Sequence, residues 1–137
     1  MFMRTSLLLL FTFWIGTSIA SVDLPLVADQ GEIPAVQLDN GKRWKANPET
    51  TQGIAAMSAI LEEHAKKQMA KSVLKEKLEG EFQMIFQKCT MTGEAHNQLH
   101  NYLIPLHKML SAMDETSGEK EIAAMRDHLQ AYGKYFE

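Results

Sequence analysis

Cysteine is the scarcest functional residue in this chain, because only Cys89 is present among 137 residues. A single cysteine excludes a disulfide within the chain and excludes covalent haem attachment through a pair of cysteines. Cys89 is therefore an inert buried residue, an intermolecular bridge, a reactive thiol or a metal ligand. Its position at the end of an apolar helical stripe favours the inert interpretation when the residue is considered alone.

Positive charge is also scarce. Lys and Arg number 14 against 17 Asp and Glu, which gives a formal net charge of −3. Removal of the first 20 residues, which contain Arg4 and no acid, would change this charge to −4. A nucleic-acid partner is excluded because phosphate neutralisation requires a basic face, and no polybasic segment is present for anionic lipid.

No hydrophobic run reaches the ~20 residues that a membrane-spanning helix needs. The longest apolar segment, residues 7–15, follows Arg4 and precedes small residues at 18 and 20, which is typical of a signal peptide cleaved after Ala20. We therefore expect a periplasmic or secreted protein with no stable membrane span after cleavage. An uncleaved N-terminal anchor is the alternative.

The remaining 117 residues are enough for one domain with one core. Residues 21–46 contain two prolines and no helical period, which predicts an extended leader. Within it, the Asn40-Gly41 pair lies between short alternating segments and predicts a type I′ turn. We expect this turn to let Trp44 cover one end of the following helices, without forming a true sheet.

Residues 47–137 show four amphipathic segments with short connections. Asn47 is the expected cap of the first helix and Thr92 that of the third, while Thr116 with Glu119 forms a predicted capping box for the fourth. The second helix must begin between residues 67 and 72, where no Gly or Pro marks the boundary. The predicted fold is all-α, an up-down-up-down four-helix bundle preceded by a cleaved signal peptide and an extended leader.

Apolar residues at a spacing of three and four define the face that each helix buries. In chain order these faces are Ile54, Met57, Leu61, His64 and Gln68, with Ile60 and Met69 alongside; Leu74, Leu78, Phe82, Ile85, Phe86 and Cys89; Leu99, Leu103, Leu106, Leu110 and Met113; and Ile122, Met125, Leu129, Tyr132 and Phe136. Gly80 weakens the second helix by ~1 kcal/mol relative to alanine and is a position where a neighbouring helix could approach closely. Pro105 predicts a kink in the third.

The segment from Cys89 to His107 gathers soft metal donors. His96 and His100 are four residues apart, so their side chains share one helical turn and could bind the same ion. Cys89 and Met91 lie two residues apart in a predicted loop, where both could point toward His96. Thiolate, thioether and imidazole together favour copper or zinc. The sequence therefore predicts a closed four-ligand site of Cys89, Met91, His96 and His100, suited to storage or transfer of the metal.

Two further histidines could support this site. His107 lies about 10 Å along the helix axis from His100, so it could join only through the kink at Pro105. His64 lies on or beside the apolar stripe of the first helix. We treat both as second-shell or alternative ligands. The competing interpretation is an amphipathic helix whose buried seam is flanked by half-exposed histidines.

Two other functions compete with metal binding as interpretations of the sequence. A cofactor-free interaction or structural bundle would use its methionine and aromatic surface against a protein partner. A non-covalent b-type haem bundle would place the haem between Met57 and His128. An enzyme is not expected, because the chain has no nucleophile elbow, phosphate loop or Glu-x-x-His pair, and Cys89 with His96 has no orienting third group.

Two runs carry a family resemblance: residues 40–51 (Asn-Gly-Lys-Arg-Trp-Lys-Ala-Asn-Pro-Glu-Thr-Thr) and residues 89–100 (Cys-Thr-Met-Thr-Gly-Glu-Ala-His-Asn-Gln-Leu-His). They resemble segments of small exported bundle proteins of Bacteroidetes-type bacteria, a group known only as uncharacterised. The likeness covers about residues 38–136, and the second run is the more specific. It implies a periplasmic four-helix protein and assigns no activity.

Overall fold

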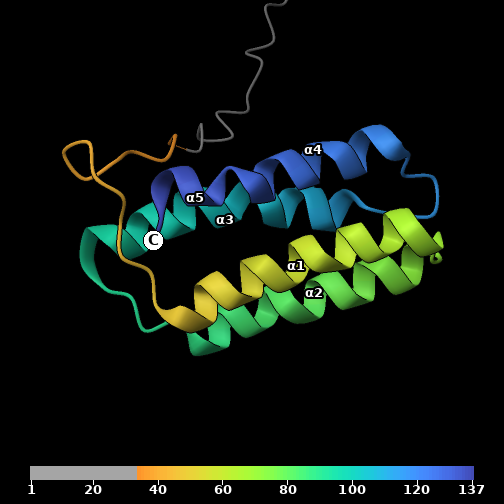
Figure 1. Ribbon diagram of the computed structural model, residues 1–137, viewed down its shortest axis with the longest axis horizontal. Coiled ribbons are helices and arrows are strands. Elements are labelled where there is room, and N and C mark those ends of the chain that lie inside the picture. The colour runs from red at the N-terminus through yellow and green to blue at the C-terminus, as the bar shows by residue number, and fades with distance from the viewer. Residues whose placement is uncertain (1–33) are drawn as a thin grey trace, which may run out of the picture. The chain divides into compact units, whose positions relative to one another are not determined.

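The computed structural model describes residues 34–137 (Figure 1). The predicted signal peptide and the first part of the predicted leader lie outside the described residues. The helices are α1 (Pro48–Lys67), α2 (Lys71–Lys88), α3 (Gly93–Ala112), α4 (Glu119–Gln130) and the one-turn α5 (Tyr132–Tyr135). The prediction of an all-α four-helix bundle is confirmed.

Two helix pairs make up the bundle, and they run side by side in Figure 1. α1 packs most extensively against α2 and also contacts α4, whereas α2 and α3 contact each other less extensively. The connections are short, so neighbouring helices alternate in direction. No helix among residues 34–137 has the length and apolar character needed to cross a membrane.

The predicted turn before α1 is present. Asn40 and Gly41 both have positive φ, 50° and 84°, and Asp39 and Lys42 exchange two backbone hydrogen bonds of 2.9 Å. Positive φ at both central residues is the signature of a type I′ turn, so this prediction is confirmed.

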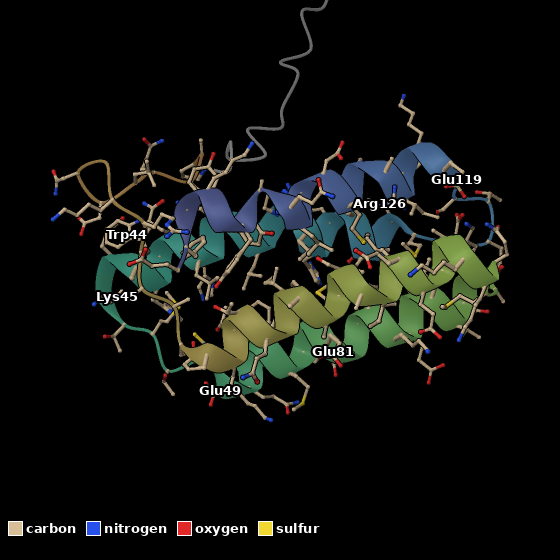
Figure 2. The ribbon with its side chains drawn as sticks, in the orientation of Figure 1. Trp44, Lys45, Glu49, Glu81, Glu119 and Arg126 are labelled. Atoms are coloured by element: carbon tan, nitrogen blue, oxygen red, sulfur yellow. The ribbon has the colours of Figure 1, made fainter. Side chains whose placement is uncertain are left out.

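Trp44 then joins this N-terminal segment to the C-terminus. Its backbone N–H donates to the carbonyl of Tyr135 (2.7 Å) and its carbonyl accepts from the N–H of Glu137 (2.9 Å). The indole Nε1 donates to the carbonyl of Gln37 (2.6 Å). The half-buried ring packs against the hydrophobic core at the end of the bundle (Figure 2), as predicted.

The boundary between α1 and α2 falls inside the predicted interval. Gln68 ends α1 in the left-handed conformation (φ 51°), and its N–H donates to the carbonyl of His64 (2.8 Å). Glycine usually occupies such a position because it has no Cβ to strain. A glutamine there explains why the end of this helix carries no clear stop signal in the sequence.

The predicted capping box of the fourth helix is wrong. α4 begins at Glu119 with Gly118 as its N-cap, and the Glu121 carboxylate accepts from the Gly118 N–H (3.0 Å). Thr116 instead donates its N–H and hydroxyl to the Asp114 carboxylate, at 2.8 and 2.6 Å. The loop therefore uses Thr116 to close a turn of its own, and the helix starts two residues later than that cap required.

The core agrees with the predicted stripes at all but three positions, Gln68, Phe86 and Cys89. Gln68 is exposed because it lies at the C-cap of α1, beyond the last helical residue. Phe86 leaves 45% of its surface exposed because it lies about 100° around α2 from the buried Ile85, at the edge of the stripe that faces α3. Cys89 is half-buried and packs against the core without being enclosed by it. His64 is buried, with 2% of its surface exposed. α3 continues through Pro105 to its last residue, Ala112.

Candidate metal centre

The loop between α2 and α3 brings the predicted cysteine and the first histidine into contact. Cys89 leaves α2 with extended backbone (φ −66°, ψ 122°), and α3 begins at Gly93, whose φ of 64° suits glycine. The resulting reversal returns the first turn of α3 over the end of α2. Cys89 Sγ lies 3.7 Å from His96 Nδ1.

This separation fits two ligands of one metal ion. With metal–sulfur and metal–nitrogen bonds of about 2.3 and 2.0–2.1 Å at a tetrahedral angle, the two donor atoms are about 3.6 Å apart. Cys89 and His96 therefore need little rearrangement to bind the same ion.

His100 extends the cluster by one helical turn. Its ring centroid lies 4.5 Å from that of His96, and its ring also meets Phe86 edge-on at 5.9 Å. Met91, the fourth predicted ligand, is half-buried and packs against the core. Within residues 34–137, no three His, Cys, Asp or Glu side chains converge as a preformed metal site. The structure thus shows a thiol–imidazole pair with a second imidazole alongside it.

Tyr132, in α5, is a buried residue that lies near enough to Cys89 to be affected by its charge. Its hydroxyl is hydrogen-bonded to that of Thr51 (3.1 Å). Burial raises the pKa of Tyr132, the Thr51 hydrogen bond lowers it, and the nearby charge of Cys89 raises it again.

His64 lies far from this cluster. Its Nε2 is 3.1 Å from Nζ of Lys71 at the start of α2, whereas Cys89 follows the other end of that helix. The 18 residues of α2 span about 27 Å. The prediction that His64 supports the cluster is therefore wrong, because the antiparallel pairing of α1 and α2 places it at the opposite end of the bundle.

His107 faces a different surface from the cluster. Its exposed ring stacks on Phe82, with centroids 5.6 Å apart and an angle of 25° between the rings. It lines the space between α2 and α3, two helical turns beyond His100. The structure therefore places His107 beside α2 and not beside Cys89.

The two predicted haem ligands do not share a cavity. Met57 is fully enclosed in the core. His128 stacks on Tyr102 at 4.5 Å, and its Nε2 lies 2.9 Å from the carbonyl oxygen of Tyr102. His128 lines a groove of about 240 Å³ with Val36 and Tyr135, and Met57 is not part of that lining.

A larger groove, which the sequence did not indicate, lies between α2 and α3. Its volume is about 610 Å³, and its walls include Phe82, Phe86, His100, Leu103, Ile104 and His107. We call it the α2–α3 groove. The feature of the sequence that could have indicated this groove is the position of Phe86, His100 and His107 at the margins of the buried stripes. Comparison with family models, curated proteins and solved structures gives no match to this chain.

Proposed function

We propose that the protein is a small exported binding protein that holds a soft transition metal, copper or zinc, at Cys89, His96 and His100, with Met91 as a further sulfur donor. The single observation that carries the proposal is the 3.7 Å separation of Cys89 Sγ and His96 Nδ1, with the His100 ring beside them. A thiolate supplies the negative charge, and neutral imidazoles supply the remaining donors.

The surroundings favour holding the metal over catalysis with it. The three side chains are half-buried, so an ion can reach them from solvent while one side remains packed against the protein. Additional coordination requires His100 and Met91 to turn toward the ion, which would close the site. Because the thiol must lose its proton to bind, uptake of metal should release a proton and weaken at low pH.

Competitive titration tests the proposal. Cuprous ion and, separately, zinc are titrated into the protein against a chromophoric chelator, with oxygen excluded. We expect one equivalent to bind, and we expect Cys89→Ser and the double variant His96→Ala/His100→Ala to lose at least about tenfold in affinity.

Matched controls separate the cluster from general histidine and methionine binding. His107→Ala removes an exposed histidine of the same helix, and Met84→Leu removes an exposed methionine to compare with Met91→Leu. Both controls should bind like the wild type. Equal stoichiometry and affinity in all variants would dispose of the proposed site.

A cofactor-free interaction bundle is the second candidate. Val73 and Met84 leave 44% and 38% of their surfaces exposed, and their spacing of 11 residues places them on one side of α2. These two exposed apolar side chains, with the charged Glu76 and Lys77 between them, would contact the protein partner. If the protein binds neither metal, and Val73→Ser/Met84→Ser abolishes self-association seen by sedimentation, this candidate replaces the first.

A further inference from the structure

The donor types at the proposed metal site distinguish copper from zinc. Cys89 offers one thiolate, His96 and His100 offer two imidazoles, and Met91 offers a thioether. Zinc sites are built from thiolate, imidazole and carboxylate, so the thioether has no role in a zinc site. One thiolate and two imidazoles around copper, with a methionine at longer range, form a centre that carries single electrons.

The Cys89–His96 contact is compatible with the trigonal plane of such a centre. Cys89 Sγ and His96 Nδ1 are 3.7 Å apart. With metal–sulfur and metal–nitrogen bonds of about 2.3 and 2.0–2.1 Å, an angle of about 120° places the two donor atoms about 3.8 Å apart, against about 3.6 Å at a tetrahedral angle. The observed distance lies between these values, so the geometry permits a trigonal centre and the donor types favour it.

Met91 lies on the same side of the loop as Cys89. Cys89 leaves α2 with extended backbone, and successive side chains of an extended segment point to opposite sides. Cys89 and Met91 are half-buried and pack against the core, whereas Thr90 between them is exposed. The thioether is therefore available on the thiol's side of the loop for the weak, long bond that such a copper centre makes with methionine.

The position of Cys89 also protects a bound cupric ion from being consumed. Two thiolates can reduce two cupric ions when they join in a disulfide, because each sulfur gives up one electron as the S–S bond forms. Cys89 is the only cysteine in the chain, so this reaction needs two copies of the protein. Their Cα atoms would have to come within about 7 Å, although each thiol is half-buried against its own core.

We propose that the cluster holds copper as a one-electron carrier, an inference that rests on the metal-binding function proposed above. In the reduced state, the Cys89 thiolate and the imidazoles of His96 and His100 bind cuprous ion. A one-electron acceptor removes one electron and leaves cupric ion on the same ligands, and a one-electron donor returns it. No ligand bond forms or breaks in this step, and no proton moves.

The test adds one equivalent of cupric ion to the full protein with oxygen excluded, and follows visible absorbance and electron paramagnetic resonance. We expect an intense thiolate-to-copper charge-transfer band that ascorbate removes and ferricyanide restores over repeated cycles. Cys89→Ser should lose the band, and His96→Ala/His100→Ala should lose it or bind copper about tenfold more weakly. Circular dichroism confirms that each variant keeps the helical fold.

The methionine is tested through the reduction potential. Met91→Leu should keep the charge-transfer band and raise the potential, because loss of a donor destabilises the cupric state more than the cuprous state, and the axial ligand of such a centre tunes its potential. Met84→Leu is the matched control, since Met84 is exposed on α2 and should leave the potential unchanged.

The possible failures of this inference and of the metal-binding function are distinguishable. Copper that binds without the band, or a band that fades irreversibly as disulfide-linked dimers form, would overturn the electron carrier and leave metal binding in place. A band that persists in Cys89→Ser would show that the thiolate is not its source and would also overturn it. Failure to bind cuprous ion, cupric ion and zinc would overturn both proposals.

Discussion

Gly53 on α1 lies directly against the side chain of Ile85 on α2. A Cβ added at position 53 would overlap Ile85 Cγ1 and would lie 3.0 Å from Ile85 Cδ1. Both residues are buried, so neither side has free space for the added atom. This contact sets how closely the two most extensively packed helices approach each other.

Gly53→Ala should therefore lower the free energy of unfolding by about 1–3 kcal/mol, because overpacking a buried contact forces backbone or side-chain shifts. This cost exceeds the gain in helix propensity, which is about 1 kcal/mol for glycine to alanine. Urea denaturation followed by circular dichroism measures the change.

Gly80→Ala is the matched control for that substitution. Gly80 lies on α2, and a Cβ there would have no atom within 4 Å, so the propensity gain is not opposed and stability should rise by about 0.5–1 kcal/mol. Shortening the opposing side chain in Gly53→Ala/Ile85→Ala should reduce the penalty of the first substitution. If both alanine variants shift stability in the same direction, the proposed close contact is not what distinguishes them.

Tyr102 connects α3 to the end of α4 through its hydroxyl, which donates to the carbonyl of His128 (2.9 Å) and, at greater length, to that of Leu129 (3.4 Å). Tyr102→Phe should cost about 1 kcal/mol at neutral pH, because two buried carbonyls lose a donor. Thermal or urea unfolding measures this loss in the free energy of unfolding. Tyr135→Phe is the control: it removes a half-buried hydroxyl that makes no such bond, so it should change the free energy of unfolding little.

Alkaline pH should destabilise the fold through the same residue. Burial, and secondarily the charge of Tyr132, raise the pKa of Tyr102. Because the pKa of Tyr102 is raised in the folded state, the stability that its protonated hydroxyl contributes is fully present below the ordinary tyrosine pKa of about 10. That contribution is lost as the pH rises above this value and through the folded-state pKa. Unfolding measured at several pH values from neutral to alkaline should show this loss, and Tyr102→Phe should reduce its steepness. An identical alkaline slope in both proteins would contradict the assignment.

Substitutions at Gly93 test whether the loop between α2 and α3 positions His96 relative to Cys89. Its φ of 64° is left-handed, and a Cβ there would meet no atom within 4 Å, so substitution acts through backbone strain alone. Gly93→Ala should cost about 1–2 kcal/mol and should weaken metal binding by moving His96 relative to Cys89. Gly93→Asn should cost less, because asparagine tolerates this conformation. Competitive metal titration beside urea denaturation separates the two effects, and unchanged metal affinity in Gly93→Ala would show that the loop does not position the pair.

The sequence predicted the parts of the structure that depend on local periodicity and capping. Asn47 and Thr92 occupy the predicted N-cap positions, but neither side chain makes a capping hydrogen bond to its helix. The type I′ turn at Asn40-Gly41 follows from its two residues alone. The fourth helix shows the limit of this approach, because Thr116 with Glu119 and Gly118 with Glu121 are overlapping capping patterns. The hydrogen bonds from Thr116 to Asp114 decide between the two patterns, and the residue types alone do not rank these bonds.

Two features that depend on how closely distant segments pack were not predicted. The sequence placed the close helix approach at Gly80, whereas it occurs at Gly53, since only the facing helix determines which glycine is crowded. The Cys89–His96 contact was predicted because both residues adjoin one short loop. The α2–α3 groove was missed because it depends on how far apart two helices pack, which periodicity along one helix does not report.

The accessibility of Cys89 provides the last test, because it separates a metal-binding thiol from an inert one. The thiol is half-buried beside His96, so in the folded, metal-free protein it should react with iodoacetamide more slowly than in urea but to completion. One equivalent of zinc should suppress this reaction about tenfold or more, since the bound thiolate is no longer available. His96→Ala/His100→Ala should lose the protection, while His107→Ala should keep it. A thiol that fails to react in the folded protein with or without metal would instead be sealed in the core, and the proposed metal site would then have no accessible sulfur.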